Sequence, residues 1–487
     1  MEYMEATNGM KPKQPAPASR LTFLSRAARI SSSQAIRRTA RFLFLFVAAR
    51  KLGPELFGLY ALLLATIETT SLISGEGLID YLTREVAKRP ERAESLFWRV
   101  TQLRLLYALV LFPVVLIVLR SLRYSGSVLI DASWLLLILF FRSPFASAQG
   151  IIRAVHRVTQ LVWLEAVQAS CLLGIGFFLL SRHADIHSVI WAEVFSSLVV
   201  GLVAIPTVKS LWPRHSRSDV PRRDIFRATF AFNLYPLIAN IYDRVDVILL
   251  SVLAGNFAAG IYALPYRALA TLQLLPLGLM TAVLPSISSS ANSESDETLC
   301  SRMVSSLYVL SLFPVLIVTL LAEPLVFFVL GRHYAESVPI LRILIWAAIP
   351  MFINYALNTY LLARSQERLF LYTNSVCAAI NIVGNFLLIP HFSYFAAAVM
   401  TVITETVLLI QNVAIIKKKF GFLVFPKGVV LTSLVFVLLL AAGVTGSYYF
   451  PSPILTAAIP LLFLTYLYFD GSLRSMVSWM SPSLIAS

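Results

Sequence analysis

Long runs of residues without a charged side chain limit this chain to a membrane-embedded fold. Residues 428–469 form a run of 42 without Asp, Glu, Lys or Arg, and 303–322 and 369–390 contain almost none. A helix that crosses the hydrocarbon core of a bilayer needs about 20 apolar residues, and it satisfies its own backbone hydrogen bonds there. The 42-residue run therefore predicts two spanning helices joined by a tight hairpin between Gly446 and Pro453.

Composition excludes the soluble classes. Of the 487 residues, 58% are hydrophobic and 13% are charged, whereas soluble domains carry about 25% charged residues. The mean hydropathy is +0.78. A soluble enzyme, a disordered protein and a secreted scaffold are all inconsistent with these values. The three cysteines show no paired spacing, so neither a disulfide nor a metal site is predicted.

The pattern predicts an all-α integral membrane protein with about fourteen transmembrane helices. The expected spans are 28–50, 57–80, 98–119, 128–150, 160–181, 186–206, 227–253, 258–284, 303–322, 338–362, 369–389, 393–415, 428–448 and 453–470.

Basic residues predict the orientation. If the N-terminus is cytoplasmic, the inner segments hold 25 Lys and Arg residues and the outer segments hold six. This bias favours cytoplasmic N- and C-termini. It also accounts for the net charge of +15 without a nucleic-acid partner. The first twenty residues lack the apolar core of a signal peptide, and we interpret them as a cytoplasmic tail.

An internal repeat links the two halves of the chain. The sequence Gly58-Leu-Tyr-Ala-Leu62 recurs as Gly260-Ile-Tyr-Ala-Leu264, an offset of 202 residues, and later spans keep a similar spacing. Short matches of this kind also arise by chance between apolar segments. Because the offset covers six spans, orientation is preserved, so we predict a parallel repeat with the substrate site between the halves near the middle of the membrane.

The repeat divides the chain into five segments. These are a cytoplasmic tail (1–25), an N-terminal six-helix bundle (26–206), a basic cytoplasmic linker (207–226), a C-terminal six-helix bundle (227–415), and two additional helices with a cytoplasmic C-terminus (416–487).

Arginines recur along one face of the first span. A charged side chain at the bilayer centre costs about 2.5–3.5 kcal/mol or more, so it should face protein or water. Arg37 and Arg41 are one turn apart, and they predict a water-filled cavity suited to phosphate, which the arginine fork binds bidentately. The alternative is an interfacial segment among lipid headgroups, which we favour for Arg26 and Arg29.

Other intramembrane polar residues are candidates for the same cavity. The seventh span carries Asn233, Asn240, Asp243 and Arg244 along one stripe, with Asp246 just beyond; structural pairing is the alternative there. Further substrate-binding candidates are Arg142, Tyr262, Arg267 and Asn381. Candidates for proton or sodium coupling are Glu68, Asp243 and Asp246, and Glu165, Glu193 and Glu405 are further acidic residues.

Catalytic motifs do not rise above chance in this sequence. No Walker motif, nucleophile elbow or zinc-binding helix motif occurs, so we expect no enzyme activity, no ATP-driven pump and no cofactor beyond a coupling H⁺ or Na⁺.

Residues 50–61 (RKLGPELFGLYA) resemble the Leu-Gly-Pro-Glu-x-Phe-Gly-x-Tyr signature of the polysaccharide transporter (Wzx-type) flippases. These belong to the multidrug/oligosaccharidyl-lipid/polysaccharide exporter superfamily. Segments 243–246, 249–251, 260–263, 330–334 and 363–366 also fit that family, so the resemblance covers roughly residues 30–415.

The resemblance implies two helical bundles around a cationic cavity. It implies a flippase that moves undecaprenyl-pyrophosphate-linked oligosaccharide from the cytoplasmic to the outer face by alternating access, for O-antigen or other surface polysaccharide. The expected location is the inner membrane, and the expected partners are membrane lipid, the lipid-linked glycan, a glycan polymerase and glycosyltransferases.

Three alternative functions remain. A lipid II flippase and a drug/cation antiporter belong to the same superfamily. A multi-span glycan polymerase or ligase belongs to another class, and it would be expected to place its catalytic residues on a sizeable outer loop. The longest expected outer loop, about 323–337, is short for that role.

Overall fold

A computed structural model describes residues 20–73, 75, 77–212, 244–280, 296–424, 429–449 and 453–470. Throughout these residues the regular structure is helical, with no strand, so the predicted all-α fold class is confirmed. The predicted site residues Asn233, Asn240 and Asp243 lie outside the described residues.

The N-terminal half contains α1 (Arg20–Ile73), α2 (Gly77–Lys88), η1 (Pro90–Arg92), α3 (Ala93–Ser121), α4 (Gly126–Phe141), α5 (Ser143–Ala154), α6 (Val158–Arg182) and α7 (Ile186–Lys209). The C-terminal half contains helical residues 244–254, α9 (Asn256–Leu272), α11 (Asp296–Val329), η2 (Arg332–Tyr334), α12 (Ser337–Leu344), η3 (Ile345–Ala347), α13 (Ala348–Ala363) and α14 (Glu367–Phe420). The last helices are α15 (Val429–Tyr449) and α16 (Pro453–Phe469).

Within the described residues, the predicted spans coincide with helical residues, and positions 227–243 and 281–284 of the seventh and eighth spans lie outside them. In the described part of the chain, nine helices are long and apolar enough to cross a membrane. Two of the long helices each hold two predicted spans, because α1 bends at Gly53 and α14 bends at Ser393, both with non-helical backbone angles. The first helix begins at Arg20 rather than at residue 28, since a helix need not end where the hydrocarbon ends. The total of fourteen spans stays a prediction.

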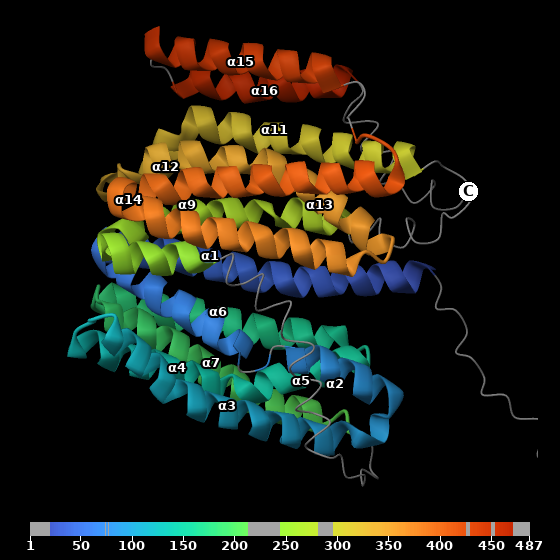
Figure 1. Cartoon of the computed structure of the whole chain (residues 1–487). Helices are drawn as coiled ribbons and strands as arrows, with labels where there is room; N and C mark the ends of the chain where they lie inside the picture. Colours follow the sequence, from blue (N-terminus) through green and yellow to red (C-terminus); the bar gives the residue numbers. More distant parts are fainter. Residues whose placement is uncertain are drawn as a thin grey trace, which may run out of the picture.

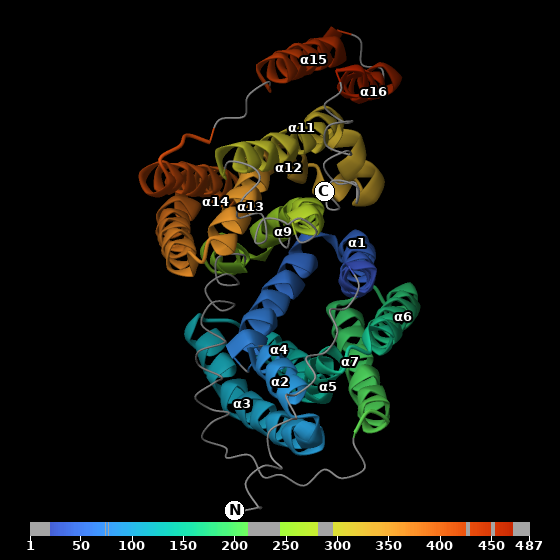
Figure 2. The ribbon, with the colours of Figure 1, turned by 90° about the vertical axis from the view of Figure 1, so that its right-hand side faces the viewer.

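The helices form two groups. Figure 1 shows the long helices running side by side in one general direction, and Figure 2 shows α1–α7 on one side and α9–α14 on the other, meeting where α1 packs on α9. The pair α15 and α16 lies outside the second group and contacts α11. This arrangement matches the predicted two bundles with two additional helices.

The repeat is visible in the backbone. Gly53 has φ 73° and ψ 172°, and Gly255, 202 residues later, has φ 90° and ψ 168°. This region of backbone space is essentially restricted to glycine. Each half therefore makes the same sharp turn at the same position of the repeat.

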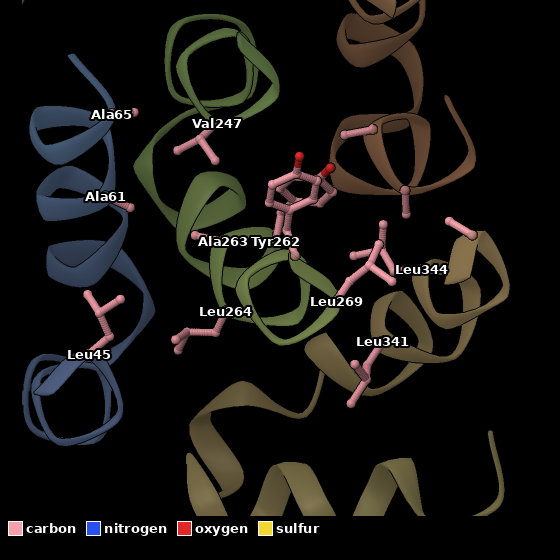
Figure 3. Close-up of a cluster of buried hydrophobic side chains, with 14 of the residues drawn as sticks. Leu45, Ala61, Ala65, Val247, Tyr262, Ala263, Leu264, Leu269, Leu341 and Leu344 are labelled. Atoms are coloured by element: carbon pink, nitrogen blue, oxygen red, sulfur yellow. The ribbon is translucent and has the colours of Figure 1, made fainter. Parts of the chain in front are cut away.

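The repeated glycines also meet each other. A Cβ atom added to Gly58 would lie 1.7 Å from the Asn256 carbonyl oxygen, and one added to Gly260 would lie 2.0 Å from that of Pro54. Helices α1 and α9 thus approach backbone to backbone, as small residues allow in membranes. Figure 3 shows Ala61 of α1 on the side of its helix that faces the C-terminal half. Equivalent residues meeting in this way are what a parallel repeat predicts.

Hydrogen bonds join the halves at the end of the bundle that carries the two glycine turns. The Tyr334 hydroxyl donates to the Ala49 carbonyl at 3.1 Å, and Arg50 Nη1 donates to the Phe328 carbonyl at 3.2 Å. The hydroxyls of Tyr124 and Ser251 lie 2.8 Å apart. The two halves are therefore in contact at the end predicted to face outward.

Candidate substrate cavity

A cavity of about 210 Å³ lies within the N-terminal half, and α1 to α7 all contribute to its walls. Its lining is mainly charged and polar. The basic side chains are Arg37, Arg41, Arg104, Arg142 and Arg153, and the acidic ones are Glu68, Asp80 and Glu193. Five cations against three carboxylates give the described wall a net positive charge.

The two segments of α1 converge on Glu193 of α7. Arg41 Nη2 lies 2.8 Å from Glu193 Oε1, and the Tyr60 hydroxyl donates to the same oxygen at 2.8 Å. Arg41 precedes the bend at Gly53 and Tyr60 follows it, so the bend brings both donors to one carboxylate. Glu193 is buried, whereas the Arg41 side chain is 21% exposed. The pairing leaves part of the guanidinium available to the cavity.

Glu165 of α6 faces the neighbouring turn of α1. Arg37 Nε is 3.9 Å from Glu165 Oε2, and Gln149 Nε2 donates to Glu165 Oε1 at 3.0 Å. The Arg37 side chain is 36% exposed. Arg37 is therefore loosely paired and more accessible than Arg41.

The end of the cavity opposite the glycine turns carries two further arginines. Arg153, at the end of α5, has Nη1 3.8 Å from Asp80 Oδ1 of α2. Arg104 of α3 is buried and donates to the Gly75 carbonyl. The lining arginines thus extend from the middle of the bundle to the end that is predicted to be cytoplasmic.

Glu68 connects the cavity to the C-terminal half. Its Oε2 lies 2.9 Å from Arg244 Nε and 3.4 Å from Arg267 Nη2. The three side chains are only 18–20% exposed. We call these three residues the Glu68 clasp. One carboxylate from the N-terminal half thereby holds two guanidinium groups from the C-terminal half.

We expect the clasp to lie within the hydrocarbon core of the bilayer and not at its edge. Glu68 is fifteen residues beyond Gly53 and Arg267 is twelve beyond Gly255, which correspond to about 22 and 18 Å along a helix at 1.5 Å per residue. The hydrocarbon core is about 30 Å thick. Charges at that depth are stable only when paired or wet.

The C-terminal half contains a separate polar cluster around Asp246. The Tyr262 hydroxyl donates to Asp246 Oδ2 at 2.9 Å, and Asn385 Nδ2 donates to Asp246 Oδ1 at 2.8 Å and to Asn381 Oδ1 at 3.1 Å. Thr401 lies beside them, its hydroxyl 3.0 Å from that of Tyr262. We call these five residues the Asp246 cluster. A space of about 10 Å³ adjoins it, with Glu405 also in its wall.

Figure 3 shows where this cluster sits in the fold. It shows Tyr262 on α9 among buried apolar side chains that include Leu269 and Leu344, and Tyr262 is fully buried, with its ring stacked on that of Tyr266 at 5.5 Å between centroids. Apolar side chains thus fix the ring while its hydroxyl reaches Asp246.

The structure separates the predicted site residues into two groups. Arg37, Arg41, Arg142 and Glu68 line the main cavity, and Arg244 and Arg267 reach it through Glu68. Asp246, Tyr262 and Asn381 belong instead to the Asp246 cluster.

The predicted location of the substrate site between the halves stays a prediction. Every described lining residue comes from the N-terminal half. In the described part of the C-terminal half, the hydrogen-bonded Asp246 cluster adjoins a space of about 10 Å³.

Sequence reasoning missed Arg104 and Arg153 as cavity residues. Arg104 lies inside the predicted span 98–119, so its charge within an apolar segment was the available signal. Arg153 follows the predicted span 128–150 and was counted with the cytoplasmic loop. Among the described residues, no group of three or more His, Cys, Asp and Glu side chains could hold a metal ion.

Comparisons with known proteins agree with this architecture. The model of the family described as "Polysaccharide biosynthesis protein" matches residues 24–291, more than half of the chain, and the MatE model matches residues 235–387. No curated protein sequence matches the chain.

Several solved structures share the fold. The lipid II flippase MurJ in an inward closed conformation is 15% identical with a TM-score of 0.70, and the match covers 90% of this chain and 98% of that one. An inward-facing multidrug resistance MATE family transporter is 13% identical with a TM-score of 0.66, over 81% and 98% of the two chains. A transporter of the same superfamily from Pyrococcus furiosus is 13% identical with a TM-score of 0.60, over 81% and 95%.

Proposed function

Because this chain belongs to the polysaccharide biosynthesis protein family of multi-pass membrane transporters, we propose that it is a flippase for undecaprenyl-pyrophosphate-linked oligosaccharide. It carries the glycan headgroup from the cytoplasmic to the outer leaflet of the inner membrane. Alternating access exposes the cavity to each side in turn. The transported glycan serves the synthesis of a surface polysaccharide such as O-antigen.

The arginine-lined cavity is the observation that carries this proposal. A pyrophosphate has at least two negative charges, and its passage through hydrocarbon without compensation would cost many kcal/mol. Arg37, Arg41 and Arg142 offer planar forks that bind phosphate oxygens in pairs. Arg104 and Arg153 extend the positive charge towards the predicted cytoplasmic entrance.

The same charge argues against a cation substrate. A drug/cation antiporter needs net negative charge where the drug binds, whereas the described wall has five arginines and three carboxylates. Lipid II is the second candidate substrate, because the MurJ fold covers 90% of this chain. For a polymerase or ligase, the sequence offers neither a catalytic motif nor a long outer loop.

We further propose that the Asp246 cluster couples transport to a cation. Asp246 is a buried carboxylate that accepts from the Tyr262 hydroxyl and from Asn385 Nδ2, with the amide oxygen of Asn381 and the hydroxyl of Thr401 in the same cluster. Carboxylate, amide and hydroxyl oxygens bind H⁺ or Na⁺. No other cofactor is required. The test is glycan export by Asp246→Asn after an imposed sodium or proton gradient. Loss of the gradient's effect is expected, and an unchanged dependence would contradict the coupling role.

The proposed orientation places both termini in the cytoplasm, where the glycosyltransferases that build the glycan act. The product emerges at the outer leaflet, where a polymerase or ligase consumes it.

A direct test uses cells from which this protein is depleted. Lipid-linked oligosaccharide is expected to accumulate on the cytoplasmic leaflet, measured by lectin accessibility in right-side-out and inverted vesicles. Accumulation of lipid II instead would assign the second candidate substrate. Unchanged amounts of both lipids would contradict the flippase proposal.

A further inference from the structure

Two guanidinium groups share one carboxylate in the Glu68 clasp. Arg244 and Arg267 approach the same oxygen, Oε2 of Glu68, at 2.9 and 3.4 Å. Two cations against one anion leave a positive excess within a few ångströms. This is the charge pattern of an anion-binding site that is filled by the protein's own carboxylate.

The Glu68 carboxylate is placed where an incoming anion can reach it. Glu68 lies in the wall of the main cavity and its side chain is 20% exposed. Arg244 and Arg267 are exposed to a similar extent. Because both guanidinium groups contact the same Glu68 oxygen, an anion that takes the place of this carboxylate would meet Arg244 and Arg267.

The Arg41–Glu193 pair shows that the clasp is distinctive. Arg41, Tyr60 and Glu193 all belong to the N-terminal half, and Glu193 is only 3% exposed. That contact is internal to one bundle. The Glu68 clasp, in contrast, joins residues 199 positions apart and crosses from one half to the other.

From these contacts we propose that Glu68 occupies a subsite for the anionic headgroup, formed by Arg244 and Arg267, and that the headgroup must displace it. The inference rests on the proposed function, because it takes the pyrophosphate as the arriving anion. When the cavity is empty, Glu68 neutralises the two arginines and ties the halves together. When a diphosphate binds, it takes both arginines and releases the tie between the halves.

The exchange of Glu68 for the diphosphate serves both the empty and the loaded stage of the transport cycle. An uncompensated pair of arginines in the bilayer would be unstable, so the carboxylate protects the empty transporter. It also competes with the bound diphosphate, which limits affinity and allows release at the other face. Anion arrival and loosening of the halves thereby become one event.

Inorganic pyrophosphate tests the subsite in the purified full-length protein, with titration calorimetry as the measurement. Glu68→Gln removes the competing charge at nearly constant size. We expect its Kd for pyrophosphate to be about tenfold lower than that of the wild type, the effect of one charge-assisted hydrogen bond. Glu68→Asp retains the charge and should bind close to wild type, which controls for disturbed packing.

Two further variants distinguish competition between Glu68 and pyrophosphate from a general effect of the net charge of the cavity. Asp80→Asn removes the same charge from the same cavity, but Asp80 pairs with Arg153 of its own half; its Kd should change less than threefold. In an Arg244→Ala/Arg267→Ala background, Glu68→Gln should change the Kd for pyrophosphate less than twofold. The two arginines for which Glu68 and pyrophosphate compete are then absent.

An equal decrease of the Kd for pyrophosphate in Glu68→Gln and Asp80→Asn would overturn the subsite. The net charge of the cavity would then explain both changes. Weaker or unchanged binding by Glu68→Gln would overturn it as well, as would the absence of pyrophosphate binding in every variant. These results are independent of the glycan assay. A protein that exports another anionic lipid would still show the Glu68 effect, so failure of the proposed function and failure of the subsite are distinguishable.

Discussion

Arg41 and Arg244 are each paired with a carboxylate that leaves part of the arginine side chain exposed. Arg41 keeps 21% of its side chain exposed while paired with Glu193, and Arg244 keeps 20% while paired with Glu68. Burying an unpaired charge would be prohibitive, whereas a fully satisfied pair would have nothing left for a ligand. A partly exposed arginine is neutralised by its carboxylate and can still bind a ligand. Replacing either arginine should therefore lower transport.

Replacement of Arg41 by Ala should lower glycan export about ten- to a hundredfold, because one charge-assisted hydrogen bond to the headgroup is lost. Arg41→Lys should retain an intermediate rate, since lysine keeps the charge and loses the fork. The measurement is surface glycan per folded transporter. Arg182→Ala is the matched control, because Arg182 lies over the Phe178 ring outside the cavity. Equal export by Arg41→Ala and the control would exclude a role for Arg41.

The contacts of Tyr60 and Arg41 with Glu193 should contribute unequally to the stability of the folded protein. Tyr60→Phe removes one hydrogen bond, worth about 1 kcal/mol. Arg41→Ala leaves the buried Glu193 carboxylate without its cation, which costs about 3–5 kcal/mol. Thermal unfolding in detergent should therefore show a clearly larger loss for Arg41→Ala. The reverse order would mean that Glu193 does not depend on Arg41.

Helix bends decide which side chains meet in this fold. The bend of α1 at Gly53 turns Arg41 and Tyr60 towards one carboxylate, and α9 repeats the turn at Gly255. The length of apolar runs is a local property, so the sequence predicted the helices well. The charge pairs were not predictable in this way. Glu68 meets Arg267 across 199 residues, and no local periodicity encodes that contact.

Gly58→Ala should disrupt the contact between α1 and α9. Its new Cβ would lie 1.7 Å from the Asn256 carbonyl oxygen, a backbone atom that cannot move aside alone. Gly174→Ala in α6 is the control, because a Cβ there meets nothing within 4 Å and alanine favours the helix. The expected result is a marked loss of folded yield and melting temperature for Gly58→Ala only. Similar values for both variants would contradict the close packing of α1 on α9.

At the scale of the whole molecule, contact between the halves is uneven along the bundle axis. Gly58 and Gly260 pack closely at the end predicted to face outward, and Tyr334 and Arg50 add hydrogen bonds there. The lining arginines extend from the middle of the bundle towards the opposite end, where Arg153 and Asp80 lie. With the predicted orientation, this is a state closed to the outside.

Orientation can be tested by reporter fusions. The bias of 25 to six basic residues predicts that a reporter after Ala254 is outside and one near Pro213 is inside. Alkaline phosphatase activity should appear only at the first site, and a cytoplasmic fluorescent reporter only at the second. An inside location for Ala254 would reverse the assignment of the closed end.

The parallel repeat and the two bundles followed from the 202-residue offset, because equivalent segments repeat their turns and spacing. The placement of the cavity did not follow, since it depends on how each half fills its interior. In the described part of the C-terminal half, Tyr262 and Asn385 both donate to Asp246, and the adjoining space is about 10 Å³. In the N-terminal half, Arg142 and its neighbours leave an open volume. That difference lies in side-chain packing between distant helices.

Reconstitution into proteoliposomes tests the central claim that the arginine cavity carries a pyrophosphate-linked glycan across the bilayer. A fluorescent undecaprenyl-pyrophosphate oligosaccharide is followed by its accessibility to a membrane-impermeant quencher. The wild type and Arg182→Ala should translocate it at equal rates, and Arg41→Ala and Arg244→Ala should be at least tenfold slower. No translocation by wild type, or equal rates for all four proteins, would contradict the claim.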